Sequence, residues 1–385
     1  MRHASFISRA TAVAAACSLV LAACGGGGSD GTPPPAPKES ISAVLTANQE
    51  VADVDSGAFG TATLSLDRAS RTLTAEIDID GVVATAAHVH AGEAGVNGAV
   101  VLPLTLAGSK ASLPATVLSA AQLADLDDGK LYLNIHSAAN AGGEIRGQIG
   151  REVFTARLTG AQETQPVSTS ASGVGRLVLN PVTRALSGEV EVEGLTATAA
   201  HIHAAGFGSN GAIAVTLEDH GGHGHFVVPA NTVLTQAQVD SLRAGGLYFN
   251  VHSAANPGGE MRGQIGRRVL LATASGAQEV PGNGSAASGR AFVTFDPATR
   301  KIQGSITVAG MTATVAHIHM AAAGVNGPVV VALAETAPGS GVWSVPADTR
   351  LTPDQAKALL TGGMYFNAHS AAFGTGEVRG QLAAQ

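Results

Sequence analysis

Histidines are concentrated in two short phrases that each occur three times. The first appears as "AAHVHAGEAGVNGAVV" (86–101), "AAHIHAAGFGSNGAIAV" (199–215) and "VAHIHMAAAGVNGPVVV" (315–331), and it places two histidines two residues apart. The second appears as "LYLNIHS", "LYFNVHS" and "MYFNAHS" and adds one more. Nine of the chain's 13 histidines lie in these phrases. Neutral imidazole binds copper and zinc, so the pattern points to metal chemistry.

Strand alternation predicts how these side chains meet. Residues two apart on a strand share a face, so His88 and His90 point the same way. The segment 131–149 reads as two strands joined by a short glycine-containing loop, which predicts a hairpin. One face of that hairpin carries Tyr132, Asn134, His136, Glu144, Arg146 and Gln148.

We therefore expect one three-histidine site per copy, with copper preferred over zinc at an all-nitrogen site. The predicted ligands are His88, His90 and His136; His201, His203 and His252; and His317, His319 and His369. Residues expected to orient the ligands or to attract an anion are Asn134, Glu144 and Arg146; Asn250, Glu260 and Arg262; and Asn367, Glu377 and Arg379. The alternative, that each trio only orders its hairpin by hydrogen bonds, stays open.

A further histidine tract occurs in the middle copy alone. The segment "DHGGHGH" (219–225) places His220, His223 and His225 among glycines. It is either a loose metal-binding loop or a polar loop without that role.

The first 40 residues are not part of the repeats. An apolar run after Arg2 and Arg9 ends in "LAAC", which resembles the bacterial lipobox. The run is too short to span a bilayer, so we expect a signal peptide at 1–23 and a lipid on Cys24. Residues 24–40 are rich in Gly and Pro and predict a tether. This start predicts a bacterial cell-envelope protein anchored in the outer membrane, facing the periplasm or the surface.

Composition narrows the function classes. The other cysteine, Cys17, lies in the predicted signal peptide, so we expect no disulfide in the mature protein. The net charge is −7 with no basic stripe, which argues against a nucleic-acid partner. No Ser–His–Asp order, P-loop or spaced acid pair indicates a hydrolase or a nucleotide-binding protein.

The repeat predicts three domains of about 115 residues, at 41–150, 151–266 and 267–385. Alternation in "RTLTAEIDIDG" indicates a half-buried strand, and Ser or Thr three residues before Gln in "SAAQL", "TQAQV" and "TPDQA" indicates one capped helix per copy. We expect an all-β protein of three tandem antiparallel Greek-key sandwiches or barrels, immunoglobulin-like or dismutase-like, each with one short helix.

The phrases "HIH…NGPVV" and "Y.N.HS…GGE.RGQ" resemble the CHRD domain, first defined in chordin. The resemblance covers about residues 41–385 and occurs three times along the chain. The resemblance implies an extracellular β-fold. Chordin's role as a growth-factor antagonist has no obvious target for a bacterial lipoprotein.

A fainter resemblance is to copper–zinc superoxide dismutase. In that family an H-V-H pair and a later histidine hold copper, and a late arginine guides the anion. Residues in matching order are His88, His90, His136 and Arg146, and their counterparts in the other copies. The bridging histidine, zinc ligands and disulfide cysteines are absent, so the resemblance implies at most a mononuclear three-histidine site.

Three functions remain in competition. The first is a non-enzymatic envelope protein whose modules bind an extracellular or envelope protein or a glycan by multivalency. The second is a copper protein, for storage or for dismutase-like redox catalysis. The third is a structural spacer of the envelope.

Overall fold

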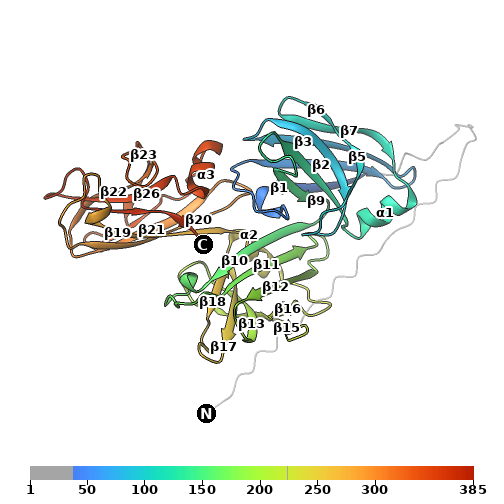
Figure 1. Ribbon diagram of the computed structural model, residues 1–385. Helices are drawn as coiled ribbons and strands as arrows, with labels where there is room; N and C mark the ends of the chain where they lie inside the picture. Colours follow the sequence, from blue (N-terminus) through green and yellow to red (C-terminus); the bar gives the residue numbers. More distant parts are fainter. Residues whose placement is uncertain (1–37, 223) are drawn as a thin grey trace, which may run out of the picture. The chain divides into compact units, whose positions relative to one another are not determined.

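Residues 38–222 and 224–385 are described by the computed structural model, and they form three antiparallel β-sheets with three short α-helices (Figure 1). Each sheet contains one copy of the repeat. The expected fold class, all-β with three tandem antiparallel domains and one helix in each, is confirmed. The expectations for Cys17, Cys24, the tether up to residue 37 and His223 lie outside the described residues.

The elements follow the same order in each copy. The first domain contains β1 (Glu39–Thr46), η1 (Ala47–Gln49), β2 (Phe59–Asp67), β3 (Thr72–Asp80), β4 (Ala84–Ala91), β5 (Ala99–Pro103), β6 (Thr105–Ala107), β7 (Lys110–Val117), α1 (Ala120–Asp127), β8 (Leu131–Ser137) and β9 (Ile145–Gln148). The second contains β10 (Glu152–Thr159), η2 (Gly160–Gln162), β11 (Ser172–Leu179), β12 (Leu186–Glu193), β13 (Ala197–Ala204), β14 (Ala212–Thr216), β15 (Glu218–Asp219), β16 (His225–Val227), α2 (Gln236–Ala244), β17 (Leu247–Ser253) and β18 (Met261–Gln264). The third contains β19 (Arg268–Ser275), η3 (Gly276–Gln278), β20 (Ser288–Phe295), β21 (Ile302–Ala309), β22 (Ala313–Met320), β23 (Val329–Ala332), β24 (Ala334–Glu335), β25 (Val342–Ser344), α3 (Pro353–Leu360), β26 (Met364–Ser370), β27 (Val378–Gln381) and β28 (Ala383–Ala384).

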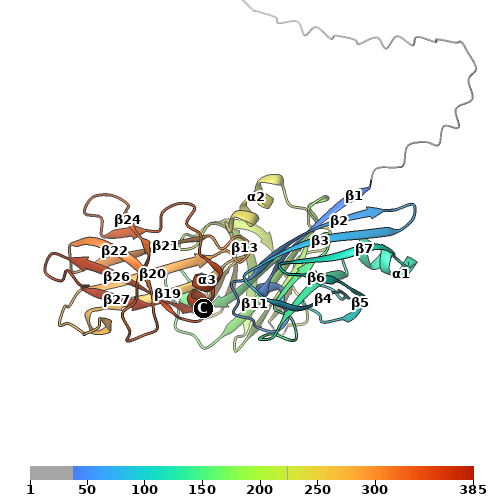
Figure 2. The ribbon, with the colours of Figure 1, turned by 90° about the horizontal axis from the view of Figure 1, so that it is seen from above.

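Each sheet consists of two strand groups joined at one narrow point. In the first domain the strand order is β5-β4-β8-β9-β1-β2-β3-β7-β6. The link between β9 and β1 is a single residue pair, Thr46 with Arg146. The group β1-β2-β3-β7 runs as adjacent strands in both ribbon views (Figures 1 and 2). The other two domains have the equivalent order, and β28 pairs additionally with β19.

The core lies between the two strand groups. Leu73, Ala75, Ile77 and Ile79 alternate along β3 and are buried, as the period-two pattern predicts. The aliphatic residues of β4, β8 and β9 pack against them from the other group. The polar faces of β4, β8 and β9 therefore point away from this core, and that is the face on which the histidines lie.

The short helices begin as the capping pattern predicts. Ser119 accepts a hydrogen bond from the amide of Gln122, whose side chain accepts one from the amide of Ser119, which completes a capping box. Thr235 and Thr352 cap α2 and α3 in the same way. Within residues 38–222 and 224–385, none of the helices has the length and apolar content needed to cross a bilayer.

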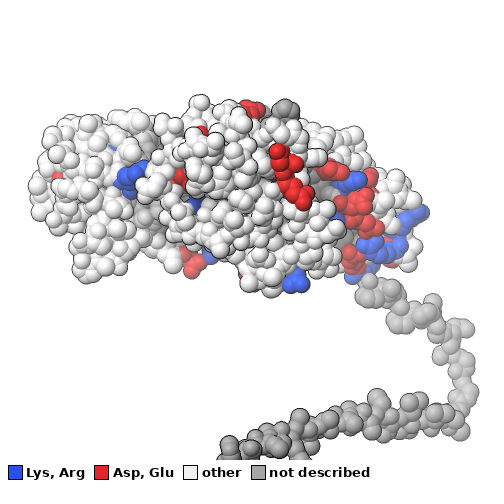
Figure 3. All heavy atoms as spheres, turned by 90° about the horizontal axis from the view of Figure 1, so that it is seen from below, with Lys and Arg blue, Asp and Glu red and all other residues white. Residues whose placement is uncertain are grey.

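Figure 3 shows the charged residues on one face of the molecule. Most of that face carries neither sign of charge, and Lys and Arg are interspersed with Asp and Glu mainly at one end of it. One such pair in the first domain joins Arg68 to Asp127 with a nitrogen–oxygen distance of 2.9 Å.

Candidate metal centre

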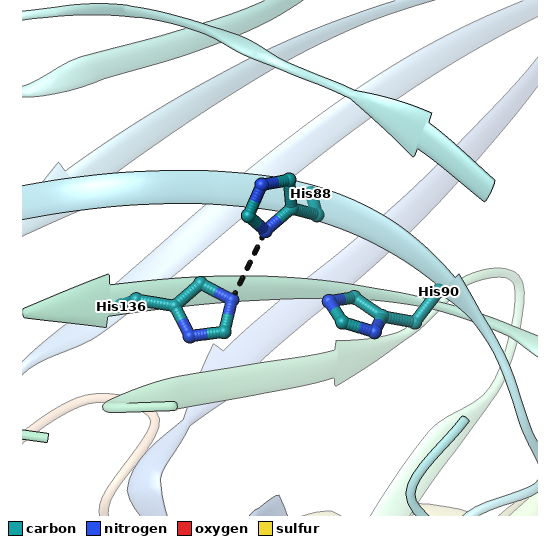
Figure 4. Close-up of side chains that lie close together, drawn as sticks. All are labelled: His88, His90 and His136. Atoms are coloured by element: carbon teal, nitrogen blue, oxygen red, sulfur yellow. Dashed lines mark hydrogen bonds between the residues drawn. The ribbon is translucent and has the colours of Figure 1, made fainter. Parts of the chain in front are cut away.

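The three predicted ligands of the first domain lie together on the polar face of β4 and β8 (Figure 4). His88 and His90 project from β4, while Val89 between them is fully buried in the core. His136 projects from the neighbouring strand β8, where its backbone pairs with Ala86. The Nδ1 atom of His88 is 3.2 Å from Nε2 of His136. One nitrogen of each ring lies within 4.8 Å of one nitrogen of each of the others.

The other two domains repeat this arrangement. Their trios, His201, His203 and His252, and His317, His319 and His369, meet the same 4.8 Å criterion. The distance corresponding to the His88–His136 contact is 3.0 Å in the second domain and 3.3 Å in the third. The structure thus brings all nine predicted ligands together in groups of three.

Two of the three imidazoles have their tautomer fixed by a backbone carbonyl. Nδ1 of His90 is 3.0 Å from the carbonyl oxygen of Gly98, and Nδ1 of His136 is 3.0 Å from that of Ala141. A carbonyl oxygen only accepts, so both Nδ1 atoms donate and both Nε2 atoms carry a lone pair. In the second domain the equivalent acceptors are Gly211 for His203 and Pro257 for His252. In the third they are Gly327 for His319 and Gly374 for His369.

One of these lone pairs has no partner. His90 is 8% exposed, and its Nε2 atom is buried without a hydrogen-bond partner in the structure. The same is true of Nε2 in His203 and His319. A buried acceptor left unsatisfied costs about 1–3 kcal/mol, so its occurrence at the same position in three domains points to a recurring partner for this lone pair, either a hydrogen-bond donor or a metal ion.

A register shift lies opposite the second histidine of each pair. The register between β4 and β5 shifts between Val89 and His90. The same shift occurs between Ile202 and His203, and between Ile318 and His319. The extra residue, Val101 in the first domain, lies on β5, so the irregularity distorts the edge strand beside the functional site and leaves β4 regular around His90. His90 itself reaches the loop that follows β4, where Nδ1 meets the carbonyl of Gly98.

That loop, residues 92–98 between β4 and β5, covers the polar face of β8 and β9. Arg146 donates to the carbonyl oxygens of Val96 (3.0 Å) and Glu93 (2.6 Å). Gln148 donates to the carbonyl oxygen of Gly92 at 2.8 Å. The predicted hairpin is present, with Asn134 opposite Arg146, so the two polar faces coincide as expected.

The placement of Arg146 corrects its predicted role. We expected this guanidinium to attract an anion, but the side chain is 1% exposed and bonds to the loop and to Gln148. Arg262 and Arg379 are buried in the same way, at 0% and 1% exposed. The arginines hold the covering loop in place and do not present a cation to solvent.

Glu144 acts on the ligands through a loop. Its carboxylate accepts hydrogen bonds from Ser137 and Asn140, each at 2.6 Å, and not from a histidine. Burial opposes ionisation, but these hydrogen bonds outweigh it and hold the pKa of Glu144 below its ordinary value. The carboxylate thereby fixes the turn that contains Ala141, the residue whose carbonyl anchors His136. Glu260 has the equivalent bonds to Ser253 and Asn256.

A half-buried glutamate, Glu50, which the ligand prediction did not include, lies beside Asn134. Burial raises the pKa of Glu50 to about 7, although nearby Arg146 opposes the shift. Its counterparts Glu163 and Glu279 accept hydrogen bonds from Asn250 (2.8 Å) and Asn367 (2.6 Å), the residues equivalent to Asn134. The signal was present in the repeated openings "TANQEV", "TGAQET" and "SGAQEV".

Burial favours the neutral form of six of the nine ligand rings by lowering their pKa values. Burial, aided by neighbouring His90, lowers the pKa of His88 below 6.5. Burial also lowers the pKa of His136, against the opposing hydrogen bond to Ala141. The same direction holds for His201, His252, His317 and His319, with burial as the main cause. Neutral imidazole is the form that binds a metal ion.

The repeated sequence matches a known family model over most of the chain. The model describes the CHRD domain, and it matches residues 41–149, 154–265 and 270–382. The chain belongs to the CHRD domain family. Each match covers one of the three sheets, and each CHRD domain contains one complete histidine trio. No curated protein matches the chain.

The remaining predicted histidines lie in the second CHRD domain, apart from its trio. His225 begins β16 and His220 directly follows β15, in the strand group that does not contain β13 and β17. His223 lies outside the described residues.

Proposed function

We propose that each CHRD domain binds one copper ion through its three histidines, which makes the chain a three-site copper-binding protein of the bacterial cell envelope. The observation that carries this proposal is the buried, unpartnered Nε2 atom of His90, His203 and His319. In each domain this atom faces two further imidazoles whose nitrogens lie within 4.8 Å.

The donor set fits copper better than other metals. All three ligands are nitrogens, and such sites bind Cu(II) more tightly than other divalent first-row metals. The distances of 3.0–3.3 Å between the paired nitrogens are close to those of two nitrogen ligands about 2.0 Å from one ion. The carbonyl bonds to Nδ1 provide the outer support that metal-binding histidines usually have.

The copper chemistry we infer is binding and storage rather than superoxide turnover. Arg146, Arg262 and Arg379 are buried and bonded to protein groups, so they are not free to guide an anion to the site. The bound ion would remain next to the partly exposed His88 ring, which allows exchange with solvent or with a partner.

Copper titration of the full chain tests the proposal. We expect three tight Cu(II) sites in the wild type and none of these in the triple variant His90→Ala, His203→Ala, His319→Ala. The three single variants are expected to lose one site each, and circular dichroism verifies that every variant is folded. Equal stoichiometry and affinity in the wild type and the triple variant would show that the trios only order their hairpins. A superoxide assay of the loaded protein distinguishes storage from dismutation.

We also propose that Cys24 carries a lipid that anchors the chain to the outer membrane. The support is the sequence "LAAC" after an apolar run, followed by a tether that starts with Gly25. Mature protein is expected to partition with membranes and to carry acyl groups on Cys24. Unchanged partitioning and N-terminal mass in Cys24→Ser would overturn the anchor while leaving the copper sites unaffected.

A further inference from the structure

The second domain contains another group of metal-ligating side chains, which come from β12 and β16. Figure 1 shows where these two strands lie. Glu189 and Glu191 lie two apart on β12 and share a face, while Val190 between them is buried. His225 lies directly opposite Glu191 on β16. One ligand atom from each of these three side chains lies within 4.8 Å of the other two.

A second histidine, His220, lies next to this group, directly after β15. The amide of His220 donates to the carbonyl oxygen of His225 at 2.8 Å, so the two residues are backbone neighbours. Their rings lie 5.3 Å apart between centroids. The group on β12 and β16 thus has a second imidazole beside it, from the residue that follows β15.

The spacing within the group fits a shared ion. Nε2 of His225 is 2.9 Å from Oε2 of Glu189. Two ligands of one tetrahedral zinc ion lie about 3.3 Å apart, so a small displacement admits the ion. The other oxygen of Glu189, Oε1, faces Arg176 at 3.6 Å, which leaves Oε2 directed at His225.

The equivalent positions in the first and third domains provide an internal comparison. In the first domain Lys110 takes the position of His225, and Asp78 takes that of Glu191. Lys110 lies opposite Asp78 and forms an ion pair with it. In the third domain Val342 lies opposite Thr307, and no charge is present. The second domain alone, among the described residues, combines carboxylates with histidine here. An ion bound by His225 would supply the positive charge that Lys110 supplies in the first domain.

We propose that Glu189, Glu191 and His225, with the His220 ring beside them, form a second metal site that takes a divalent ion of the zinc class. An imidazole combined with carboxylates is a donor set that suits Zn²⁺, whereas Mg²⁺ prefers oxygen ligands alone. The site does not depend on the copper trios, because it shares no residue with them.

Zinc binding by the full chain, measured by equilibrium dialysis and elemental analysis, tests this proposal. We expect His225→Lys, which introduces the first-domain residue, to bind one Zn²⁺ fewer per chain than the wild type. The double variant Glu189→Gln, Glu191→Gln is expected to lose the same ion. Asp240→Asn, which removes a carboxylate from α2 in the same domain, is expected to lose none.

The outcome is separable from that of the copper proposal. The wild type is expected to bind one Zn²⁺ more per chain than His225→Lys, whether or not the trios also bind zinc. Zinc binding by the trios would raise the number of ions in both proteins equally. Equal zinc content in folded wild type and His225→Lys would overturn the site, as would displacement of the ion by equimolar Mg²⁺. Circular dichroism verifies folding, which Lys is expected to preserve because Lys110 occupies the same position in the first domain.

Discussion

The phenol ring of Tyr132 stacks on the imidazole of His90, with ring centroids 5.0 Å apart and 14° between the ring planes. The guanidinium of Arg146 covers the same phenol ring, 3.5 Å from its centroid. The Tyr132 hydroxyl accepts a hydrogen bond from the amide of Gly98 at 3.1 Å, and the carbonyl of Gly98 anchors His90. The His90 ring is therefore held on its face by the Tyr132 stack and at its edge by the hydrogen bond to Gly98. Tyr248 and Tyr365 make the equivalent stacks in the other domains.

Removing this stack is expected to loosen the copper site. In a chain with His203→Ala and His319→Ala, which leaves the first site alone, Tyr132→Leu is expected to weaken Cu(II) binding by about 10-fold or more, the usual effect of losing outer-shell support. Tyr132→Phe retains the ring and is expected to lose less than about 3-fold. Competition with a chelator of known affinity measures both. Equal losses would show that the hydroxyl, and not the stack, positions His90.

A methyl group at residue 98 is expected to separate the covering loop from β4. A Cβ atom at Gly98 would lie within bonding distance of the Ala91 carbonyl oxygen, so the loop must move and take the anchor of His90 with it. In the same single-site chain, Gly98→Ala is expected to lower copper affinity by about 10-fold or more. Gly142→Ala is the matched control, because a Cβ there meets no atom within 4 Å. A drop of equal size in the control would contradict the role of the loop.

Copper binding is expected to weaken as the pH falls, and the weakening is expected at pH values below the pKa of a free imidazole. Burial lowers the pKa values of His88 and His136 in the folded chain below 6.5, so these rings stay neutral at pH values where an exposed histidine is protonated. Unfolded chain then binds more protons than folded chain, so the metal-free fold loses stability as the pH drops through about 6.5. Copper titrations from pH 8 to pH 5 measure the pH at which copper binding is lost. Loss of copper above pH 6.5 would contradict this expectation.

The buried carboxyl of Glu50 is expected to make the first domain less stable at high pH. Its pKa of about 7 in the folded chain, against 4.5 as the ordinary value, means that the fold holds this proton and loses stability as the pH rises through that interval. Glu50→Gln keeps an acceptor for Asn134 and is expected to stabilise the domain by about 1–3 kcal/mol at pH 8 and little at pH 4. Hydrogen exchange of β8 amides measures this locally, with exposed Glu76→Gln as control. A gain independent of pH would rule out ionisation as the cause.

Each CHRD domain is expected to fold alone. Residues 267–385 contain a complete sheet and a core cluster of their own, which includes Trp343 and Phe366. The fragment is expected to show β-type circular dichroism and a cooperative thermal transition. Persistent disorder of the fragment would show that it depends on the rest of the chain.

The sequence was sufficient for the strands and for the histidine trios because both follow from period-two alternation. His88, His90 and His136 share a face once β4 and β8 pair, whatever the loops do. The direction of Arg146 was not predictable, because alternation gives its face but not the loop that folds over that face. Glu50 was also missed as part of the site. It follows η1, close to the single β1–β9 residue pair, and only that long-range pairing brings it to Asn134.

The carbonyl anchors have a consequence for how these domains tolerate change. Ala141, Pro257 and Gly374 have little in common as side chains, yet each offers the same oxygen to its histidine, always five residues downstream. Even proline serves, because it lacks the amide hydrogen but keeps the carbonyl. Gly98, Gly211 and Gly327 likewise all lie eight residues after theirs. The anchor of the third histidine is thus encoded in loop length rather than in residue identity, so a one-residue insertion between His136 and Ala141 is expected to be more harmful than most replacements there. The anchor of the second histidine combines a fixed loop length with a glycine in all three domains.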